Sequence, residues 1–449
     1  MPVKATNRLK YLDYIWLLPI IYSVAVVVIF GVNVIHWDEW DLVGLYERIE
    51  QNGFLNISTI KHLFAQHNEH RIFFPVIIML ISHKITHFNV TVCMLITQLM
   101  AIAVYAGCIR YLYSQTNSKS YLMEKIFILL LGIICLSSIQ NENFLWGFQV
   151  AFYMAIFAAA VSLYYFHAYC AGGSVKHGIL SLLLGIIASF SSLHGLFVWP
   201  VIVIIALICL ISGDRSTLKK VIPYIPIGII CFMVYFYGWK RPTQHPDLSR
   251  NVYLIVKFFL GSIGGVYTGK YSRLTVLLGG ATALVSALLV LIFFRQKKIN
   301  AILFPIGLIG FGYAALLSIA VGRSGFSIGW STSSRYMSFS LLSLLGTVMI
   351  IYQFLIAEDN KNQKKLKVVV MCVVSLFSLL ILFGNLKGFY RTVKYDSPSK
   401  KENVIILQNY EDQPLEQLRR VYPWSTYDRA HDMIGRLKER RLNVFSNAP

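Results

Sequence analysis

Long apolar segments separated by short polar loops recur along almost the whole chain. Most are about 17–25 residues long, the length that a helix needs to cross the hydrocarbon core of a bilayer. The pattern predicts an all-α polytopic membrane protein, a bundle of about 11–13 transmembrane helices. The predicted apolar helices lie near residues 14–35, 72–87, 90–112, 125–140, 148–170, 178–194, 196–213, 221–238, 252–269, 273–294, 301–321, 337–356 and 368–384.

The composition agrees with a membrane location. Hydrophobic residues make up 56% of the chain and charged residues 14%, with a mean hydropathy of +0.60; soluble domains are about 25% charged. The first apolar run, Ile15 to Ile35, follows basic residues but has no small-residue cleavage site before the next polar loop. We therefore expect it to remain as a first transmembrane helix with its N-terminus in the cytoplasm.

The net charge of +20 does not indicate a nucleic-acid partner, because many basic residues occupy short loops between apolar segments. This is the positive-inside pattern, which orients loops toward the cytoplasm, and excess basic charge also attracts anionic membrane lipids. If these loops are all cytoplasmic, residues 72–112 make one net crossing and residues 252–269 do not cross. The loops are Arg110/Lys119/Lys125, Arg215/Lys219/Lys220, Arg295/Lys297/Lys298 and Lys361/Lys364/Lys365/Lys367.

In this orientation the remaining polar segments share the exterior face, so any chemistry is expected there. The chain divides into a transmembrane domain, 1–384, and a small soluble exterior segment, 385–449, that leans on it. Two short amphipathic helices are predicted in this tail, Glu411 to Tyr422 and Tyr427 to Arg441. The exterior segments of the membrane domain are the long first loop 36–71, then 140–149, 191–195, 238–251 and 322–336.

The first exterior loop opens with Trp37-Asp38-Glu39-Trp40-Asp41, three carboxylates beside two indoles. Neighbouring carboxylates repel one another, which raises the pKa of at least one and suits it to act as a base. The indoles offer a surface on which a sugar ring or an isoprenyl chain can pack. The competing interpretation is a helix-capping acidic cluster in the interfacial aromatic belt. Asp38, Glu39 and Asp41 are the candidate catalytic residues.

The same loop ends with His67-Asn68-Glu69-His70-Arg71, directly before the next apolar segment. A helical turn there would place His67, His70 and Arg71 on one face, where they could contact a phosphate or, less expectedly, a divalent metal. The HExxH signature is absent, so we expect no metal site. The alternative is a hydrated helix start with Arg71 reaching toward lipid headgroups. His67, Glu69, His70 and Arg71 are candidate substrate-binding residues.

Two later exterior segments add further candidates for substrate binding. Arg323 and Arg335 bracket a Gly/Ser-rich loop, and Tyr336 follows at the mouth of an apolar helix; guanidiniums and flexible backbone N–H groups suit a lipid phosphate or pyrophosphate. The ordinary alternative is a loop with one interfacial arginine. A dense polar cluster between two apolar helices either lines a cavity or forms an exposed turn; its candidates are Asn143, Trp146 and Gln149.

Taken together, this layout resembles the GT-C superfamily of membrane glycosyltransferases, near uncharacterised bacterial members and the O-antigen-modifying glucosyltransferases. The resemblance implies a bacterial inner-membrane enzyme that uses a polyprenyl-phosphate sugar and carries its base on the first loop, here Asp38 or Glu39. Its implied partners are membrane lipids, a cell-envelope glycan acceptor, a donor synthase and a flippase. The short motifs that carry it are 67–71, 143–149, Gly195-Leu196-Phe197-Val198-Trp199-Pro200, Gly322-Arg323 and Ser334-Arg335-Tyr336.

The hypothesis is therefore transfer of a sugar from a polyprenyl-phosphate donor to an envelope glycan or lipid on the periplasmic face, without a required cofactor. An O-antigen polymerase or ligase is one alternative, although such enzymes usually carry their long catalytic loop late in the chain. A non-enzymatic lipid or glycan transporter (a flippase) is another, and it would place charges inside the helices. A non-catalytic envelope assembly partner is the third.

Overall fold

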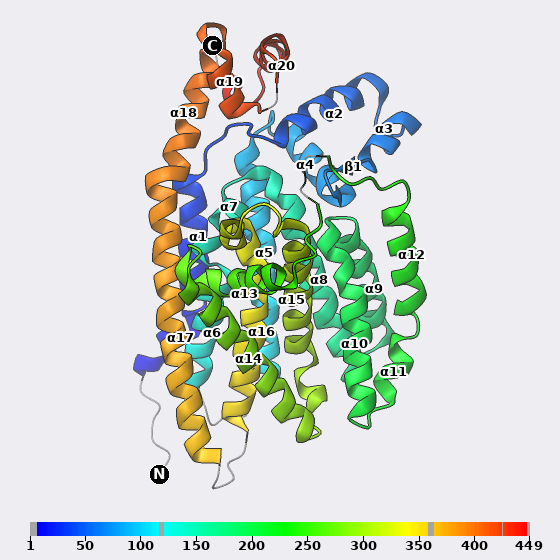
Figure 1. The fold of residues 1–449 in the computed structure, drawn as a ribbon, viewed down its shortest axis with the longest axis vertical. Helices are drawn as coiled ribbons and strands as arrows, with labels where there is room; N and C mark the ends of the chain where they lie inside the picture. The colour runs from blue at the N-terminus through cyan, green and yellow to red at the C-terminus, as the bar shows by residue number, and fades with distance from the viewer. Residues whose placement is uncertain are drawn as a thin grey trace.

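The computed structural model describes residues 7–115, 121–243, 245, 247–357, 363–423 and 425–446. It is an elongated helical bundle with a smaller group of elements at one end, which we call the tail end (Figure 1). Ten of its helices are long and apolar enough to cross a membrane. The chain is thus an all-α polytopic membrane protein, as its hydropathy predicts.

The elements match the predicted segments closely. The thirteen apolar segments appear as ten long and three shorter helices, at α4, α9 and α13. The bounds are α1 Leu17–Phe30, α2 Glu39–Asn52, α3 Ile57–Leu63, β1 Gln66–His67, β2 His70–Arg71, α4 Phe73–Ile85, α5 Val90–Gln115, α6 Tyr121–Cys135, α7 Asn141–Phe144, α8 Val150–Cys170, α9 Val175–Ser189, α10 Val198–Ile211, α11 Ser216–Val221, α12 Tyr224–Phe236, α13 Val252–Thr268, α14 Arg273–Arg295, α15 Leu303–Arg323, α16 Met337–Ile356, α17 Gln363–Arg391, α18 Ser397–Gln408, α19 Leu415–Val421 and α20 Tyr427–Glu439.

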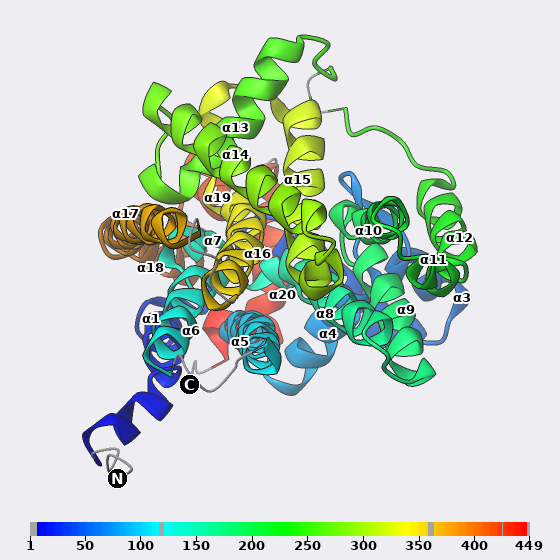
Figure 2. The same ribbon diagram turned by 90° about the horizontal axis from the view of Figure 1, so that it is seen from below.

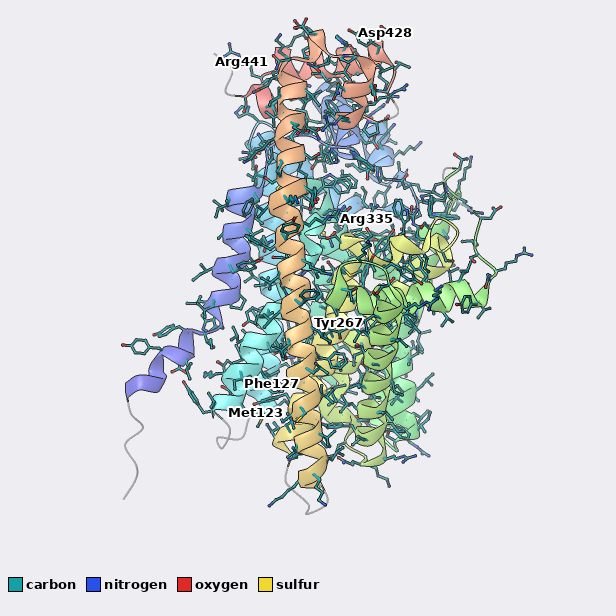
Figure 3. The ribbon with its side chains drawn as sticks, turned by 60° about the vertical axis from the view of Figure 1, so that its left-hand side comes forward. Met123, Phe127, Tyr267, Arg335, Asp428 and Arg441 are labelled. Atoms are coloured by element: carbon teal, nitrogen blue, oxygen red, sulfur yellow. The ribbon has the colours of Figure 1, made fainter. Side chains whose placement is uncertain are left out.

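Two of the shorter helices, α4 and α13, do not run the length of the bundle (Figure 1). The loop after α4 contacts the tail, since Asn443 N–H donates to the carbonyl of His87 at 2.8 Å. α13 lies across the long axis of the bundle (Figures 1 and 3). The region 72–112 therefore traverses the bundle once and 252–269 does not traverse it. With α9 added to the ten long helices, the described part of the chain makes eleven traverses.

α16 forms the centre of the bundle (Figure 2), and every residue from Met337 to Leu355 is buried. Its neighbour α15 approaches closely because glycines lie at the crossing: a Cβ on Gly312 would stand 2.5 Å from the carbonyl oxygen of Phe339. Small residues permit such backbone contact where no hydrophobic effect drives helices together within lipid. The α15–α16 pair is thus a rigid frame for the loops at its ends.

The tail starts as a continuation of the last membrane helix. α17 runs past the predicted boundary at residue 384 and, through a π turn at Thr392–Asp396, into α18. After residue 384 the side chains become polar, but the backbone stays helical. The helix therefore continues beyond its apolar part. The two predicted amphipathic helices are confirmed as α19 and α20.

The tail packs on the first loop, beside α2 (Figure 1). Trp40 stacks on Tyr422 with ring centroids 4.7 Å apart, and its Nε1 donates to the carbonyl of Val421 at 3.0 Å. Arg436 pairs with Glu47 of α2 at 3.1 Å. The tail therefore holds α2 in place against the membrane domain.

Candidate functional site

One pocket of about 570 Å³ opens near the tail end of the bundle. Figure 3 shows Arg335 at this level, whereas Met123 and Phe127 of α6 lie toward the opposite end. All five polar segments predicted to share one face contribute to it. The contributing residues include Asp38, the hairpin residues His67–His70, Phe148 and Gln149, Ser191–His194, Trp239, Arg241, Pro242, His245, Gly322, Arg323, Arg335 and Tyr336.

Residues 66–71 form a two-stranded hairpin, and the predicted helical turn is wrong. Gln66 pairs with Arg71 and His67 with His70, while Asn68 turns the chain with a φ of 49°. Directly paired residues point to the same face of a hairpin, and successive residues alternate. His67 and His70 therefore both line the pocket, and Arg71 points to the other face.

Arg71 is occupied by backbone carbonyls outside the pocket. Its Nε donates to Tyr235 O at 2.7 Å, its Nη1 to Phe64 O at 2.7 Å and its Nη2 to Tyr237 O at 2.5 Å. A guanidinium presents its N–H donors in a fixed planar arrangement, so one Arg side chain can bind carbonyls of two chain segments at once. Arg71 thus fixes the hairpin to the end of α12.

Asp38 stands at the start of α2 and faces the pocket. The preceding residue, Trp37, has a φ of 52°, a region that residues other than glycine seldom adopt and that recurs at functional sites. Asp38 caps no backbone N–H of α2 with its side chain, and its carboxylate is 34% exposed. Of Asp38, Glu39 and Asp41, only Asp38 lines the pocket.

Glu39 is buried behind the pocket wall. Its two oxygens accept hydrogen bonds from the backbone N–H groups of His36 and Phe148, at 2.8 and 3.0 Å. Burial raises the pKa of Glu39 well above its usual range, opposed by the charge of Lys400 and by these two bonds. Lys400 itself donates to the carbonyl of Leu145. Glu39 therefore joins the first loop to the segment before α8.

His67 bridges the other two carboxylates. Its Nε2 lies 3.9 Å from Asp38 Oδ1, and its Nδ1 lies 3.3 Å from Asp41 Oδ2. Burial lowers the pKa of His67, but the two carboxylates more than offset this and raise it to about 9. Asp41, whose side chain is 67% exposed, stands outside the pocket on the solvent side of this bridge.

Glu69 lies against one guanidinium and two imidazoles. It pairs with Arg323, with His70 Nε2 at 3.5 Å and with His245 Nε2 at 3.6 Å. Burial raises the pKa of Glu69, but His70, Arg323 and His245 outweigh it and lower the pKa to about 2. Leu193 N–H donates to His70 Nδ1 at 3.2 Å, which leaves the proton of a neutral imidazole on Nε2, facing Glu69.

Arg335 is placed by the polar cluster that precedes α8. Its Nε lies 3.7 Å from Glu142 Oε1, and Asn143 donates to its carbonyl at 2.9 Å. Its guanidinium lies 5.7 Å from the ring centroid of Tyr336, a cation–π distance. Asn143 thus supports the loop from behind and does not line the pocket, while Arg335 and Tyr336 do.

Two other candidates of that cluster have different places. Trp146 donates from its Nε1 to His36 O at 3.3 Å, which ties it to the first loop outside the pocket. Gln149 lines the pocket and is buried. Its Oε1 has no hydrogen-bond partner within the described part of the chain. A buried unpaired amide oxygen is costly, so this atom is suited to accept a bond from a ligand hydroxyl.

The pocket also has an apolar wall that reaches toward the lipid. Ala314, Leu317 and Val321 line it along the same helix as Arg323. At 1.5 Å per residue, the nine residues from Ala314 to Arg323 span about 13 Å. Leu317 is 48% exposed on the surface of the bundle. The site can therefore accommodate an amphipathic ligand with a charged head and a long apolar chain.

Among the thirteen candidate residues, eight line the pocket: Asp38, His67, Glu69, His70, Gln149, Arg323, Arg335 and Tyr336. The other five, Glu39, Asp41, Arg71, Asn143 and Trp146, support it from outside. His245 was not among the candidates, although its loop was assigned to the correct face. A lone histidine in a Pro-containing loop gives no pattern that links it to Glu69.

The described residues contain no group of three or more His, Cys, Asp or Glu side chains that could hold a metal ion. A scan of the sequence against protein-family models finds no match, and a search of curated proteins finds no relative. Inference about function therefore rests on the geometry of this pocket.

Proposed function

We propose that the protein is a membrane glycosyltransferase of the GT-C type, which moves a sugar from a polyprenyl-phosphate donor to a cell-envelope glycan or lipid. The observation that carries the proposal is the composition of one pocket. It combines a carboxylate, Asp38, with two guanidiniums, Arg323 and Arg335, and an apolar wall along α15. A lipid-phosphate sugar has the matching parts: an acceptor-facing sugar, an anionic phosphate and a long isoprenoid.

In the proposed reaction Asp38 is the general base. It takes the proton from an acceptor hydroxyl as that oxygen bonds to the anomeric carbon of the sugar. The bond from the anomeric carbon to the phosphate oxygen breaks, and its electron pair leaves with the lipid phosphate. Attack from the face opposite the leaving group inverts the anomeric centre. Both bond changes are balanced by the transfer of one proton to Asp38.

The guanidiniums would stabilise the negative charge that develops on the departing phosphate. In many enzymes such electrostatic stabilisation of the transition state is the largest single contribution to catalysis. Arg335 has the greater capacity for this, because its 3.7 Å contact with Glu142 is looser than the pairing of Arg323 with Glu69. Gln149 and Tyr336 would bind hydroxyl groups of the sugar. The isoprenoid would lie along Ala314 and Leu317, having entered from the membrane.

The proposed location follows from charge. The basic loops that join α10 to α11 and α14 to α15 lie at the end of the bundle away from the tail (Figure 1), and such loops face the cytoplasm. The pocket and tail would then face the periplasm of a bacterial inner membrane. The donor would be made and turned across the membrane by a separate synthase and flippase.

The test is sugar transfer by purified protein in vesicles, with radiolabelled polyprenyl-phosphate sugars and envelope glycans. Asp38→Asn should lower kcat by roughly 10²–10⁴-fold, the usual contribution of a general base. Asp41→Asn is the matched control: it removes a carboxylate from the same histidine but outside the pocket, and it should retain most activity at neutral pH.

Folding of both variants would be checked by thermal denaturation. Equal transfer by wild type and Asp38→Asn would contradict the assignment of the base. Movement of the lipid-linked sugar across the vesicle membrane with no transfer would favour a flippase instead.

A further inference from the structure

His67 occupies a bridging position that the proposed reaction does not use. Its two ring nitrogens face different carboxylates, Asp38 in the pocket and Asp41 on the solvent side. The ring lies 5.1 Å from that of Phe148, and the side chain is only 17% exposed. Its hairpin partner His70 is fastened by Leu193 N–H. The imidazole therefore has a carboxylate near each ring nitrogen, and its hairpin is fixed in place through His70.

The side chains that face His67 come from three elements. Asp38 and Asp41 belong to the start of α2, His70 to the second strand of the hairpin, and Phe148 adds an uncharged ring from the segment before α8. Burial opposes a charge on His67, and the two carboxylates favour it more strongly, whereas burial lowers the pKa of His70. At neutral pH His67 is thus an imidazolium between two carboxylates.

We infer that His67 is a positioning residue, anchored by Asp41, that holds the carboxylate of Asp38 directed into the pocket. This inference rests on the proposed function, in which Asp38 is the base. The sequence predicts His67 as a substrate contact, and the geometry gives it a different part, because Asp41 lies at its Nδ1 while Asp38 and the side chain of Asn68 lie at its Nε2.

A positive charge on His67, beside Asp38, matters most when the donor binds in the pocket. The donor's phosphate brings negative charge into a pocket that already holds Asp38 and Glu69, and like charges repel one another. The protonated ring of His67, 3.9 Å from Asp38, offsets this repulsion and favours one orientation of the carboxylate. Asp41, in turn, holds His67 in its charged form.

The first measurement does not depend on activity. Protein labelled with ¹⁵N-histidine would be titrated by NMR in detergent, with the His67 signal assigned by its loss in His67→Gln. His67 should titrate near pH 9 in wild type and roughly one pH unit lower in Asp41→Asn, since a neighbouring opposite charge shifts a pKa by about 1–3. Titration near 6.5 in both proteins would overturn the inference.

The second measurement is the pH dependence of kcat for transfer. As pH rises through the pKa of His67, the imidazolium is lost, so wild-type kcat should fall above pH 9. Asp41→Asn should show the same fall at a lower pH. His67→Lys, which keeps a cation, should retain more activity than His67→Gln, and its fall should move toward the ordinary lysine pKa of about 10.4.

His67→Gln should lose roughly 10–100-fold in kcat, less than the loss of the base itself, with an unchanged KM for the donor. A rise in KM with kcat intact would instead make His67 a donor-binding residue and overturn the inference. Glu402→Gln, at an exposed ion pair in the tail, is the control and should keep the wild-type profile.

The outcomes separate the two proposals. Transfer by wild type with an Asp41→Asn profile that does not move refutes the role of His67 and leaves the glycosyltransferase standing. If the wild type transfers sugar from no donor, the proposed function is refuted. The positioning role of His67 is then refuted too, because it depends on that function.

Discussion

At the scale of single residues, Glu69 makes a large pH-dependent contribution to the stability of the site. Its pKa is lowered from an ordinary value of 4.5 to about 2, so its ionised form stabilises the folded state above the ordinary pKa. This stabilisation, about 3 kcal/mol from the size of the pKa change, is lost as pH falls from about 4.5 toward 2. Thermal denaturation in detergent should therefore show a steeper loss of Tm for wild type than for Glu69→Gln between pH 5 and pH 3.

Glu402→Gln is the control for this measurement, because its carboxylate is largely exposed and should leave the slope unchanged. An equal slope in wild type and Glu69→Gln would mean that the guanidinium and imidazoles around Glu69 do not stabilise its charged form.

The roles of single residues were the part of the site that the sequence could predict least. Asp38 and Glu39 are adjacent and chemically alike, yet one lines the pocket and the other is buried against the backbone of Phe148. That difference depends on a segment more than 100 positions away. Arg71 could be expected to meet phosphate by charge alone, but its strand alternation turns it away from the pocket.

At the scale of elements, the hairpin depends on the left-handed backbone of Asn68, whose φ is 49°. Asparagine tolerates this region, glycine adopts it without cost, and a β-branched residue is strained there. Asn68→Gly should leave Tm nearly unchanged, whereas Asn68→Val should lower the free energy of unfolding by about 1–2 kcal/mol. Differential scanning fluorimetry of both variants would measure this. A Tm for Asn68→Val equal to that of wild type would contradict the hairpin.

Elements with a strong hydropathy signal could be predicted from the sequence, and short ones could not. Each predicted apolar segment corresponds to a helix, and α19 and α20 follow the amphipathic pattern of the tail. Two-residue strands are too short for any periodicity to show. The end of α17 was also missed, because hydropathy marks where lipid contact ends, whereas the helix continues through polar residues to α18.

At the scale of the whole molecule, the pocket joins segments from residue 38 to residue 336. Their common location could be predicted because basic loops divide a membrane chain into two faces. The apolar wall could not, since Leu317 has the same hydropathy as any other lipid-facing leucine, and only packing shows that it continues the pocket. This wall gives the site its access to the membrane.

If the donor's isoprenoid lies along the apolar wall, binding should depend on the length of that isoprenoid chain. Leu317→Trp would fill part of the apolar wall some 9 Å, or six residues, from Arg323. It should raise KM for a long-chain polyprenyl-phosphate sugar about tenfold, a loss of about 1.4 kcal/mol in binding. KM for a short-chain, water-soluble analogue should change little, because that donor does not reach Leu317. Steady-state transfer assays with both donors in vesicles would measure the two values.

Leu284→Trp is the matched control, since Leu284 is also exposed, on α14, but does not line the pocket. It should leave KM unchanged for both donors. If Leu317→Trp raised KM equally for the long and short donors, the substitution would be disturbing binding of the sugar phosphate that both donors share. The isoprenoid would then have to lie elsewhere. A selective effect on the long donor would instead place the isoprenoid along α15, with its phosphate at the arginines and its sugar facing Asp38.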